Sequence, residues 1–384
     1  MASEPPVIDI HTHVYSSSYI SLLRSRTTVP YLLDPFEKGA SPRLLILPSD
    51  DDPSLPPGSR GRPIDPSYTD IGAKLNFMST HHITASVISL ANPWLDFLPP
   101  EEGPGWARMI NDELEFTCNR NQGKLWAFAT LPLSASPPDI VTEVDRLQTL
   151  PHIRGIILGT TGLGNGLDDP NLDSIWAALE EKQLPIFLHP HYGLPSSLYG
   201  PRASEYGHVL PLSLGFPMET TIAFTRMWLS GVFDRYPKLK LLIAHSGGTI
   251  PFLAGRIDSC VQHERHFPEH SNEYGEKSRG PERSLDRVLL DNIWLDAVVY
   301  SETGVRAAVD KVSYKKVLFG TDHPFFPRLD GGAEKWASVE TNFDAVAGGQ
   351  DNAGSSAILG GNAIALLGLE INPGKAEDSP VQGL

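Results

Sequence analysis

Short apolar runs rich in β-branched and aromatic residues recur along the chain, and each has the length of a single β-strand. Eight such runs occupy residues 7–11, 83–89, 124–131, 154–160, 185–191, 239–245, 292–298 and 317–322. Most of them are continuously apolar rather than alternating, which is typical of strands that are buried on both faces of a parallel sheet.

Stretches with the spacing of amphipathic helices lie between these runs. In residues 172–183, Leu172, Ile175, Trp176 and Leu179 stand at positions i, i+3, i+4 and i+7. Similar stretches occupy residues 106–122, 139–149, 217–233, 249–266 and 303–311. The alternation of eight strands with helices predicts an α/β protein, and it favours a (β/α)8 TIM barrel over an open doubly wound sheet.

A dinucleotide-binding sheet is the alternative, but no Gly-x-Gly-x-x-Gly motif follows the first apolar run. The glycines of GLGNG, residues 162–166, lead into a segment in which a helix could begin only after Pro170. We therefore interpret this stretch as a loop.

Two regions interrupt the alternation. Residues 14–82 separate the first two apolar runs and include the segment 48–66, which is rich in Pro, Gly and Asp. An insertion of this length after a barrel strand is typical of a lid or a subunit contact. Residues 373–384 have the composition of a disordered tail. We expect one barrel domain over residues 1–372.

The composition excludes several classes of protein. Of the 384 residues, 46 are acidic and 31 basic, which gives a net charge of −15, and no basic stripe suggests a nucleic-acid partner. Cys118 and Cys260 are too few for a disulfide framework, which favours a reducing compartment. Neither a signal peptide nor an apolar run of about 18 residues is present, so we expect a cytoplasmic protein without a membrane partner.

Metal-binding side chains stand where several of the predicted strands end. His11 and His13 are two residues apart at the end of the first strand, and residues with this spacing share a face. His189, His245 and Asp322 close the fifth, sixth and eighth strands. In a barrel, these ends form the mouth that carries the active site.

A single histidine at a strand end is more often a hydrogen-bonded packing residue than a ligand. Five metal-competent side chains at the same end of four strands are hard to explain in that way. Imidazole and carboxylate ligands suit a catalytic zinc ion, although manganese, cobalt and iron remain open. Hydrolases of this layout that hold two metals bridge them with a lysine or glutamate near the fourth strand, and RGIILGTTG contains neither, so we expect one metal ion.

The chain resembles the amidohydrolase superfamily, in the branch of decarboxylases around aminocarboxymuconate-semialdehyde decarboxylase. The resemblance rests on H-x-H in the first strand, the histidine of the fifth, His-Ser-Gly-Gly on the sixth and Gly-Thr-Asp in the eighth. Longer strings are most similar to fungal isoorotate (5-carboxyuracil) decarboxylases. They are SLANPW, RGIILGTTGLGNGLDDP, FLHPHYGLP, YGHVLPLSLGFPMETT, AHSGGTIPFLAGRI and FGTDHPFFP.

The resemblance implies a set of site residues. The implied metal ligands are His11, His13, His189 and Asp322. His245 matches the histidine beside the metal water. Because decarboxylation needs a proton at the ring carbon, we take Asp322 as the hypothetical donor, with His245 as the alternative donor. His191 lies beyond Pro190, and we interpret it as a second contact around the centre or part of the pocket wall, with simple loop packing nearly as plausible.

The resemblance also implies the substrate contacts. Arg62 and Arg256 match two arginines that grip carboxylate groups, and the second reaches in from a neighbouring subunit of a homodimer or homotetramer. Asn92 matches an amide for the pyrimidine edge, and Phe216 and Phe325 match aromatic residues against the ring faces.

The sequence therefore predicts a carboxy-lyase that removes CO2 from 5-carboxyuracil to give uracil. A decarboxylase of aminocarboxymuconate semialdehyde or of a dihydroxybenzoate remains an alternative. A mononuclear metal hydrolase of a lactone or amide is the alternative from another class. An inactive barrel that serves as an interaction protein is a third, and the intact ligand set disfavours it.

Overall fold

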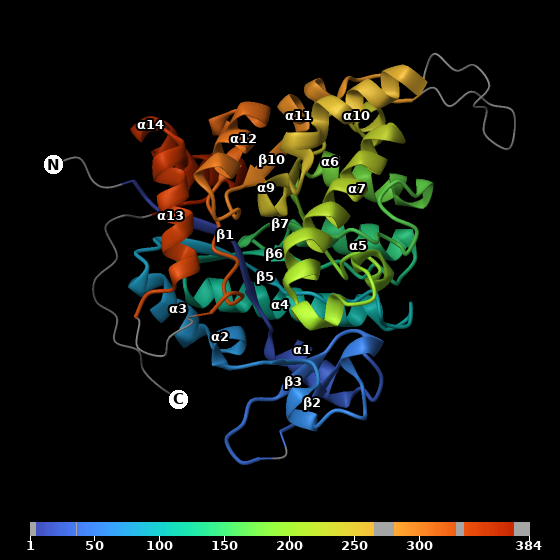
Figure 1. The fold of residues 1–384 in the computed structure, drawn as a ribbon, viewed down its shortest axis with the longest axis vertical. Helices are drawn as coiled ribbons and strands as arrows, with labels where there is room; N and C mark the ends of the chain where they lie inside the picture. The colour runs from blue at the N-terminus through green and yellow to red at the C-terminus, as the bar shows by residue number, and fades with distance from the viewer. Residues whose placement is uncertain (1–4, 36, 265–279, 328–333, 372–384) are drawn as a thin grey trace, which may run out of the picture.

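Eight parallel strands form one sheet that curls into a nearly closed barrel with helices around it (Figure 1). The computed structural model describes residues 5–35, 37–264, 280–327 and 334–371. In order around the barrel, the strands are β1 (Ile8–Val14), β5 (Ala85–Leu90), β6 (Leu125–Ala129), β7 (Ile153–Gly159), β8 (Ile186–His189), β9 (Leu241–Ile243), β10 (Ile293–Asp296) and β11 (Val317–Leu318). Each corresponds to a predicted run, so the predicted barrel is confirmed. The predicted tail, residues 373–384, lies outside the described residues.

The barrel closes between β1 and the segment that follows β11. The backbone N–H of Ile10 donates to the carbonyl of Phe319 at 3.1 Å, and that of His13 donates to the carbonyl of His323 at 2.7 Å. The strand predicted over residues 317–322 is thus regular only in its first two residues. The rest stays against β1 but follows an irregular path, with Asp322 in the left-handed region at φ 58°.

Helices follow the strands and pack their apolar faces on the sheet. The longer ones are α4 (Gly103–Arg120), α5 (Pro137–Leu147), α6 (Asp173–Glu181), α7 (Phe216–Leu229), α10 (Ile250–Glu264), α11 (Leu285–Asn292), α12 (Glu302–Val312), α13 (Ala337–Gly349) and α15 (Asn362–Leu367). Helix α5 shows the local cause: Ser136 caps the amide of Asp139, and the buried face repeats every three to four residues. All six predicted helices are present, although the last two residues of the stretch 249–266 lie outside the described residues.

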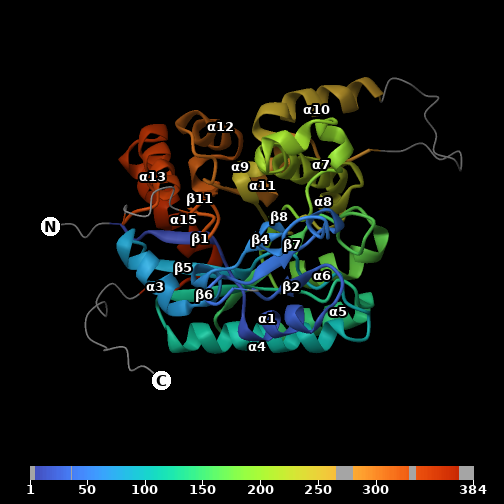
Figure 2. The same ribbon diagram turned by 60° about the horizontal axis from the view of Figure 1, so that its bottom comes forward.

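The segment between β1 and β5 has structure of its own. It contains α1 (Ser17–Ser25), α2 (Pro66–Thr69), α3 (Ile71–Thr80) and an antiparallel sheet of β2 (Tyr31–Leu33), β3 (Arg43–Leu45) and β4 (Arg62–Pro63). This small sheet lies at the end of the barrel toward which β1 runs (Figures 1 and 2). That position is compatible with the predicted lid or subunit contact, which stays a prediction.

Burial is nearly complete inside the barrel. Every residue of β1, β5, β6 and β8 is buried. Several of these buried residues are polar, and they gather toward the carboxyl ends of the strands, where His11, His13 and His189 lie. Within the described residues, no helix combines the length and apolar character that a bilayer crossing needs.

Candidate metal centre

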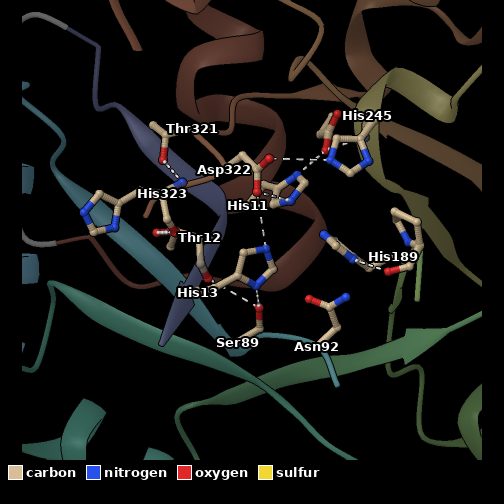
Figure 3. A network of polar contacts seen from close by, with 12 residues as sticks. His11, Thr12, His13, Ser89, Asn92, His189, His245, Thr321, Asp322 and His323 are labelled. Carbon is tan, nitrogen blue, oxygen red and sulfur yellow. Dashed lines mark hydrogen bonds and ion pairs between the residues drawn. The ribbon is translucent and has the colours of Figure 1, made fainter. Parts of the chain in front are cut away.

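Four side chains from separate parts of the chain converge at the mouth of the barrel (Figure 3). Strand β1 supplies His11 and His13, β8 supplies His189, and the irregular segment after β11 supplies Asp322. One ligand atom from each of the four lies within 4.8 Å of all the others. The structure therefore brings together the four predicted ligands, and all four are buried.

The three imidazoles turn the same ring atom toward the shared space. Their Nδ1 atoms make hydrogen bonds, that of His11 with Asp296 at 2.6 Å, that of His13 with Ser89 at 3.0 Å and that of His189 with the carbonyl of Pro190 at 2.7 Å. Their Nε2 atoms are buried and have no hydrogen-bond partner. A buried nitrogen without a partner is costly, and a cation among the three Nε2 atoms would remove that cost. The residues present therefore fit a divalent metal ion.

The charge states also suit a cation. Burial lowers the pKa of His13 to about 4 and that of His189 well below its usual value, so both imidazoles are neutral. Burial opposes the ionisation of Asp322, but the charge of His11 and further hydrogen bonds hold its pKa well below the usual range. Burial also disfavours the charged form of His11, but the carboxylates of Asp322 and Asp296 outweigh burial and raise the pKa of His11 to about 10. A bound cation would take the place of that proton.

His245 lies beside the four ligands but is not one of them. It comes two residues after β9, and its backbone is left-handed at φ 53°. Its Nε2 is 3.6 Å from the second carboxylate oxygen of Asp322, and its Nδ1 is buried without a hydrogen-bond partner. His245 therefore lies next to the four ligands, as predicted, in a position to exchange a proton with Asp322.

His191 belongs to the wall around the centre. Its Nδ1 is 3.0 Å from the hydroxyl of Thr161, its Nε2 is 3.3 Å from Asp96, and its ring packs 4.8 Å from that of Trp94. It is absent from the group of four converging ligands. The preference for His189 over His191 that the resemblance implied agrees with this geometry.

The last residue of β7 has no room for a side chain. A Cβ atom on Gly159, its last residue, would lie 2.8 Å from His191 Nδ1 and 2.8 Å from the ring of Trp94. A lysine or glutamate could not project from this position without moving both neighbours. No bridging lysine or glutamate stands at this position, and the expectation of one metal ion stays a prediction.

Three of the predicted substrate contacts lie together beside the centre. Arg62, on β4, donates to the hydroxyl of Tyr15 at 2.5 Å and to the backbone carbonyl of Asn92 at 3.1 Å. Its guanidinium lies 4.8 Å from the centroid of the Phe325 ring, which is in turn 5.6 Å from the ring of His13. The segment between β1 and β5 therefore delivers an arginine to the barrel mouth.

The other two predicted contacts lie elsewhere. Phe216 begins α7 and borders the loop after β8, where a Cβ atom on Gly193 would be 3.5 Å from its ring. Arg256 is exposed on α10, and no hydrogen bond or ion pair joins its side chain to another residue of the described ranges. Within one chain, the structure does not bring Arg256 to the site.

Sequence reasoning missed Asp296, Ser89 and Tyr15. Asp296 is the last residue of β10, so the rule that found the other strand-end side chains would have found it too. The predicted strand extended over residues 292–298, two residues beyond the observed end of β10, so Asp296 was not recognised as a strand-end residue. The hydrogen-bonding role of Ser89 and Tyr15 depends on contacts between strands, which the sequence alone does not give.

Comparison with known proteins places the chain in a family. A family model described as amidohydrolase matches residues 8–369. The chain belongs to the amidohydrolase family.

Members of this amidohydrolase family with similar sequences or structures include decarboxylases. The 2-amino-3-carboxymuconate-6-semialdehyde decarboxylase of Dictyostelium discoideum is 26% identical over 366 residues, which cover 95% of this chain and 92% of that protein. The apo crystal structure of the isoorotate decarboxylase (IDCase) of Metarhizium anisopliae is 46% identical, with a TM-score of 0.86 over 94% of this chain and 97% of its own.

A more distant structure shares the fold. The 5-carboxyvanillate decarboxylase of Novosphingobium aromaticivorans, in complex with manganese and a nitrobenzoic acid, is 19% identical with a TM-score of 0.73 over 95% of this chain and 96% of its own. With the metal site, these relatives identify the chain as a metal-dependent decarboxylase, a carboxy-lyase of the amidohydrolase family.

Proposed function

We propose that the protein is an isoorotate decarboxylase, which converts 5-carboxyuracil to uracil and CO2. The similarity to the Metarhizium IDCase carries this proposal, because it extends over 94% of the chain at 46% identity. The metal centre by itself does not select the substrate.

The proposed metal is one Zn2+ ion per chain, bound by His11, His13, His189 and Asp322. Three imidazoles and a carboxylate suit zinc, and the cation would take the place of the proton that His11 holds in its absence. The manganese in the Novosphingobium enzyme makes that ion the first alternative to test. When bound, the cation would supply positive charge against the substrate carboxylate and the adjacent ring oxygen.

The residues beside the centre suit a planar pyrimidine carboxylate. Arg62 offers a guanidinium to an anionic group, and its Nε is buried without a hydrogen-bond partner. The side-chain nitrogen of Asn92 already donates to the carbonyl of His191 at 2.6 Å. Asn92 therefore has its side-chain oxygen left to accept a ring N–H, and Phe216 and Phe325 would bound the ring faces.

The chemistry requires a proton at ring carbon 5. As this proton adds to the carbon, the bond to the carboxylate breaks, its electron pair stays with the ring and CO2 leaves. We assign Asp322 as the donor, with His245 as the alternative. The lowered pKa of Asp322 means that its carboxylate must first take up this proton, and the 3.6 Å from its oxygen to His245 Nε2 allows His245 to supply it.

Arg256 would complete the site from a second subunit. The proposed assembly is a homodimer or homotetramer in which this arginine reaches the substrate of its neighbour. Its exposure on α10 and its lack of a partner among the described residues are consistent with that arrangement.

A small substrate panel tests the substrate assignment. We expect loss of the ultraviolet absorbance of 5-carboxyuracil with release of uracil and CO2. Aminocarboxymuconate semialdehyde and a dihydroxybenzoate should react at least about ten-fold more slowly in kcat/KM. Turnover of a lactone or amide without CO2 would instead establish the hydrolase.

Metal removal and one variant test the mechanism. Elemental analysis should give about one ion per chain, and thorough chelation should abolish activity, which the same ion restores. Full activity without metal would contradict the metal assignment. Near-normal turnover of Asp322→Asn with metal still bound would show that Asp322 is not the proton donor.

A further inference from the structure

Asp296 contacts both the metal ligand His11 and the backbone of His245, although it is neither one of the four ligands nor a predicted site residue. It is the last residue of β10 and is fully buried. No Lys or Arg forms an ion pair with it among the described residues; its one ion-pair partner there is His11. A buried carboxylate is costly unless hydrogen bonds satisfy it, so each contact of Asp296 is informative.

One carboxylate oxygen of Asp296 holds the ring of His11. The distance from His11 Nδ1 to this oxygen is 2.6 Å. Because a carboxylate can only accept, Nδ1 keeps its proton, and Nε2 is the nitrogen whose lone pair becomes available when a cation displaces the second proton of His11. Nε2 is the atom that faces Asp322, at 3.3 Å, without a hydrogen-bond partner. Asp296 thus selects the tautomer of His11 that binds a cation.

The same carboxylate holds the turn that carries His245. It accepts the backbone N–H of His245 at 3.0 Å and that of Ser246 at 2.7 Å. The backbones of both residues are left-handed, at φ 53° and 54°, a conformation that residues other than glycine rarely adopt. The hydroxyl of Ser246 donates back to the carbonyl of Asp296 at 2.9 Å. These bonds offset the strain of the turn that presents the His245 ring to Asp322.

A second buried aspartate near His11 shows that proximity alone does not give this role. Asp9 accepts the backbone N–H of His11 at 3.2 Å and two bonds from Thr321, at 3.0 and 2.7 Å. It contacts no imidazole nitrogen through a hydrogen bond among the described residues. Asp9 therefore holds the backbone of His11 and the residue Thr321, whereas Asp296 holds the imidazole ring of the ligand His11.

We propose that Asp296 is a positioning residue that couples the metal ligand His11 to the proton-handling residue His245. Its carboxylate aims Nε2 of His11 at the cation and holds the His245 turn beside Asp322. The measurement of turnover rests on the proposed function, because it uses 5-carboxyuracil as the substrate. The measurement of metal affinity does not depend on the substrate.

Asp296→Asn is the direct test because it keeps the size of the side chain. The oxygen of the introduced amide can still accept from the Ser246 N–H. Its nitrogen would replace the carboxylate oxygen that accepts from both His11 Nδ1 and the His245 N–H, so it would donate to His11 Nδ1, move the ring proton to Nε2 and remove the bond to His245. We expect the affinity for Zn2+, measured by competition with a chromophoric chelator, to fall about 10–100-fold. At saturating Zn2+, kcat should fall at least about ten-fold while KM changes less than about three-fold.

Glu115→Gln is the matched control. Glu115 accepts from His152 Nδ1 at 2.6 Å, the same distance as in the Asp296–His11 pair, at the start of β7 and so at the opposite end of the barrel. The control should leave Zn2+ affinity and kcat within about two-fold of the wild type. A folded Asp296→Asn protein with Zn2+ affinity or kcat equally unchanged would overturn the proposal.

A measurement on the unaltered protein covers the case in which the variant does not fold. In the zinc-loaded protein with 15N-labelled histidine, we expect the NMR spectrum of His11 to show a protonated Nδ1 and a metal-bound Nε2. Metal binding through Nδ1 would overturn the proposal. If 5-carboxyuracil is not turned over at all, the affinity and NMR results still decide the role of Asp296, so the two failures are distinguishable.

Discussion

At the scale of single residues, the same imidazole side chain performs different tasks according to the partner of its Nδ1 atom. In His11, His13 and His189 a hydrogen bond engages Nδ1, so Nε2 is free to bind a cation. In His245, Nδ1 has no partner, and Nε2 faces a carboxylate. The sequence predicted which histidines reach the barrel mouth, because strand ends are local. It could not predict the Nδ1 partners, because most of these come from other strands.

This difference between ligand and neighbour can be measured. We expect His13→Gln to lose most of its bound metal, because an amide replaces a buried imidazole ligand. His245→Gln should keep about one ion per chain while its kcat falls about 100-fold or more, because it removes a proton-transfer group. Elemental analysis and steady-state kinetics of both purified variants check this. A His245→Gln protein without metal would make His245 a ligand after all.

Lys316 gives a prediction about the pH dependence of stability. Burial lowers its pKa to about 8, which the carboxylate of Asp291 opposes only in part. Between this value and the usual 10.5, the unfolded chain binds the proton that the folded chain has lost, so the free energy of unfolding contributed by Lys316 rises with pH. Urea denaturation of the wild type and Lys316→Met at pH 7 and pH 10 should show the difference between them moving in favour of the wild type at pH 10. The opposite sign would contradict the lowered pKa.

At the scale of elements, the sequence predicted those strands and helices that a local pattern of apolar residues determines. The eight strands were predictable because each is a short apolar run that burial on both faces requires. The small sheet of β2, β3 and β4 was missed because its strands have only two or three residues within a Pro- and Gly-rich segment. The irregular path after β11 was missed because its direction depends on packing against β1.

Gly320 marks this packing between β1 and the segment after β11. A Cβ atom at Gly320 would lie 2.6 Å from the Cβ of His11. Gly320→Ala should therefore push this segment away from β1 and lower the free energy of unfolding by about 1–3 kcal/mol. Because Asp322 follows two residues later, metal affinity should fall as well.

Gly105→Ala is a control for this effect. Gly105 lies near the start of α4, where an added Cβ atom would have no neighbour within 4 Å, and alanine suits a helix. Urea denaturation and chelator competition should leave this variant at or above the wild-type values. A Gly320→Ala protein with unchanged stability and metal affinity would show that the two segments separate without cost.

At the scale of the whole molecule, the barrel and its four metal ligands were predictable from one chain, whereas the substrate site was predictable only in part. Arg62, Asn92 and Phe325 do gather beside His13. Arg256 does not, and its proposed place depends on a second copy. Exposed apolar side chains on α7 and α10, with Phe252 88% exposed, are compatible with a subunit contact on the face that carries Arg256.

Mixing two inactive variants tests whether Arg256 acts across a subunit interface. Arg256→Ala and Asp322→Asn should each be inactive alone. If Arg256 acts in trans, a hybrid dimer has one site with an intact Asp322 and the partner's intact arginine. Random reassociation of equal amounts should then restore about 25% of wild-type activity, because half the dimers are hybrid and each has one complete site. If Arg256 acts within its own chain, every site in every mixture lacks one residue, and no activity returns. Mixing Arg62→Ala with Asp322→Asn is the matched control: Arg62 contacts the site of its own chain, so that pair should stay inactive.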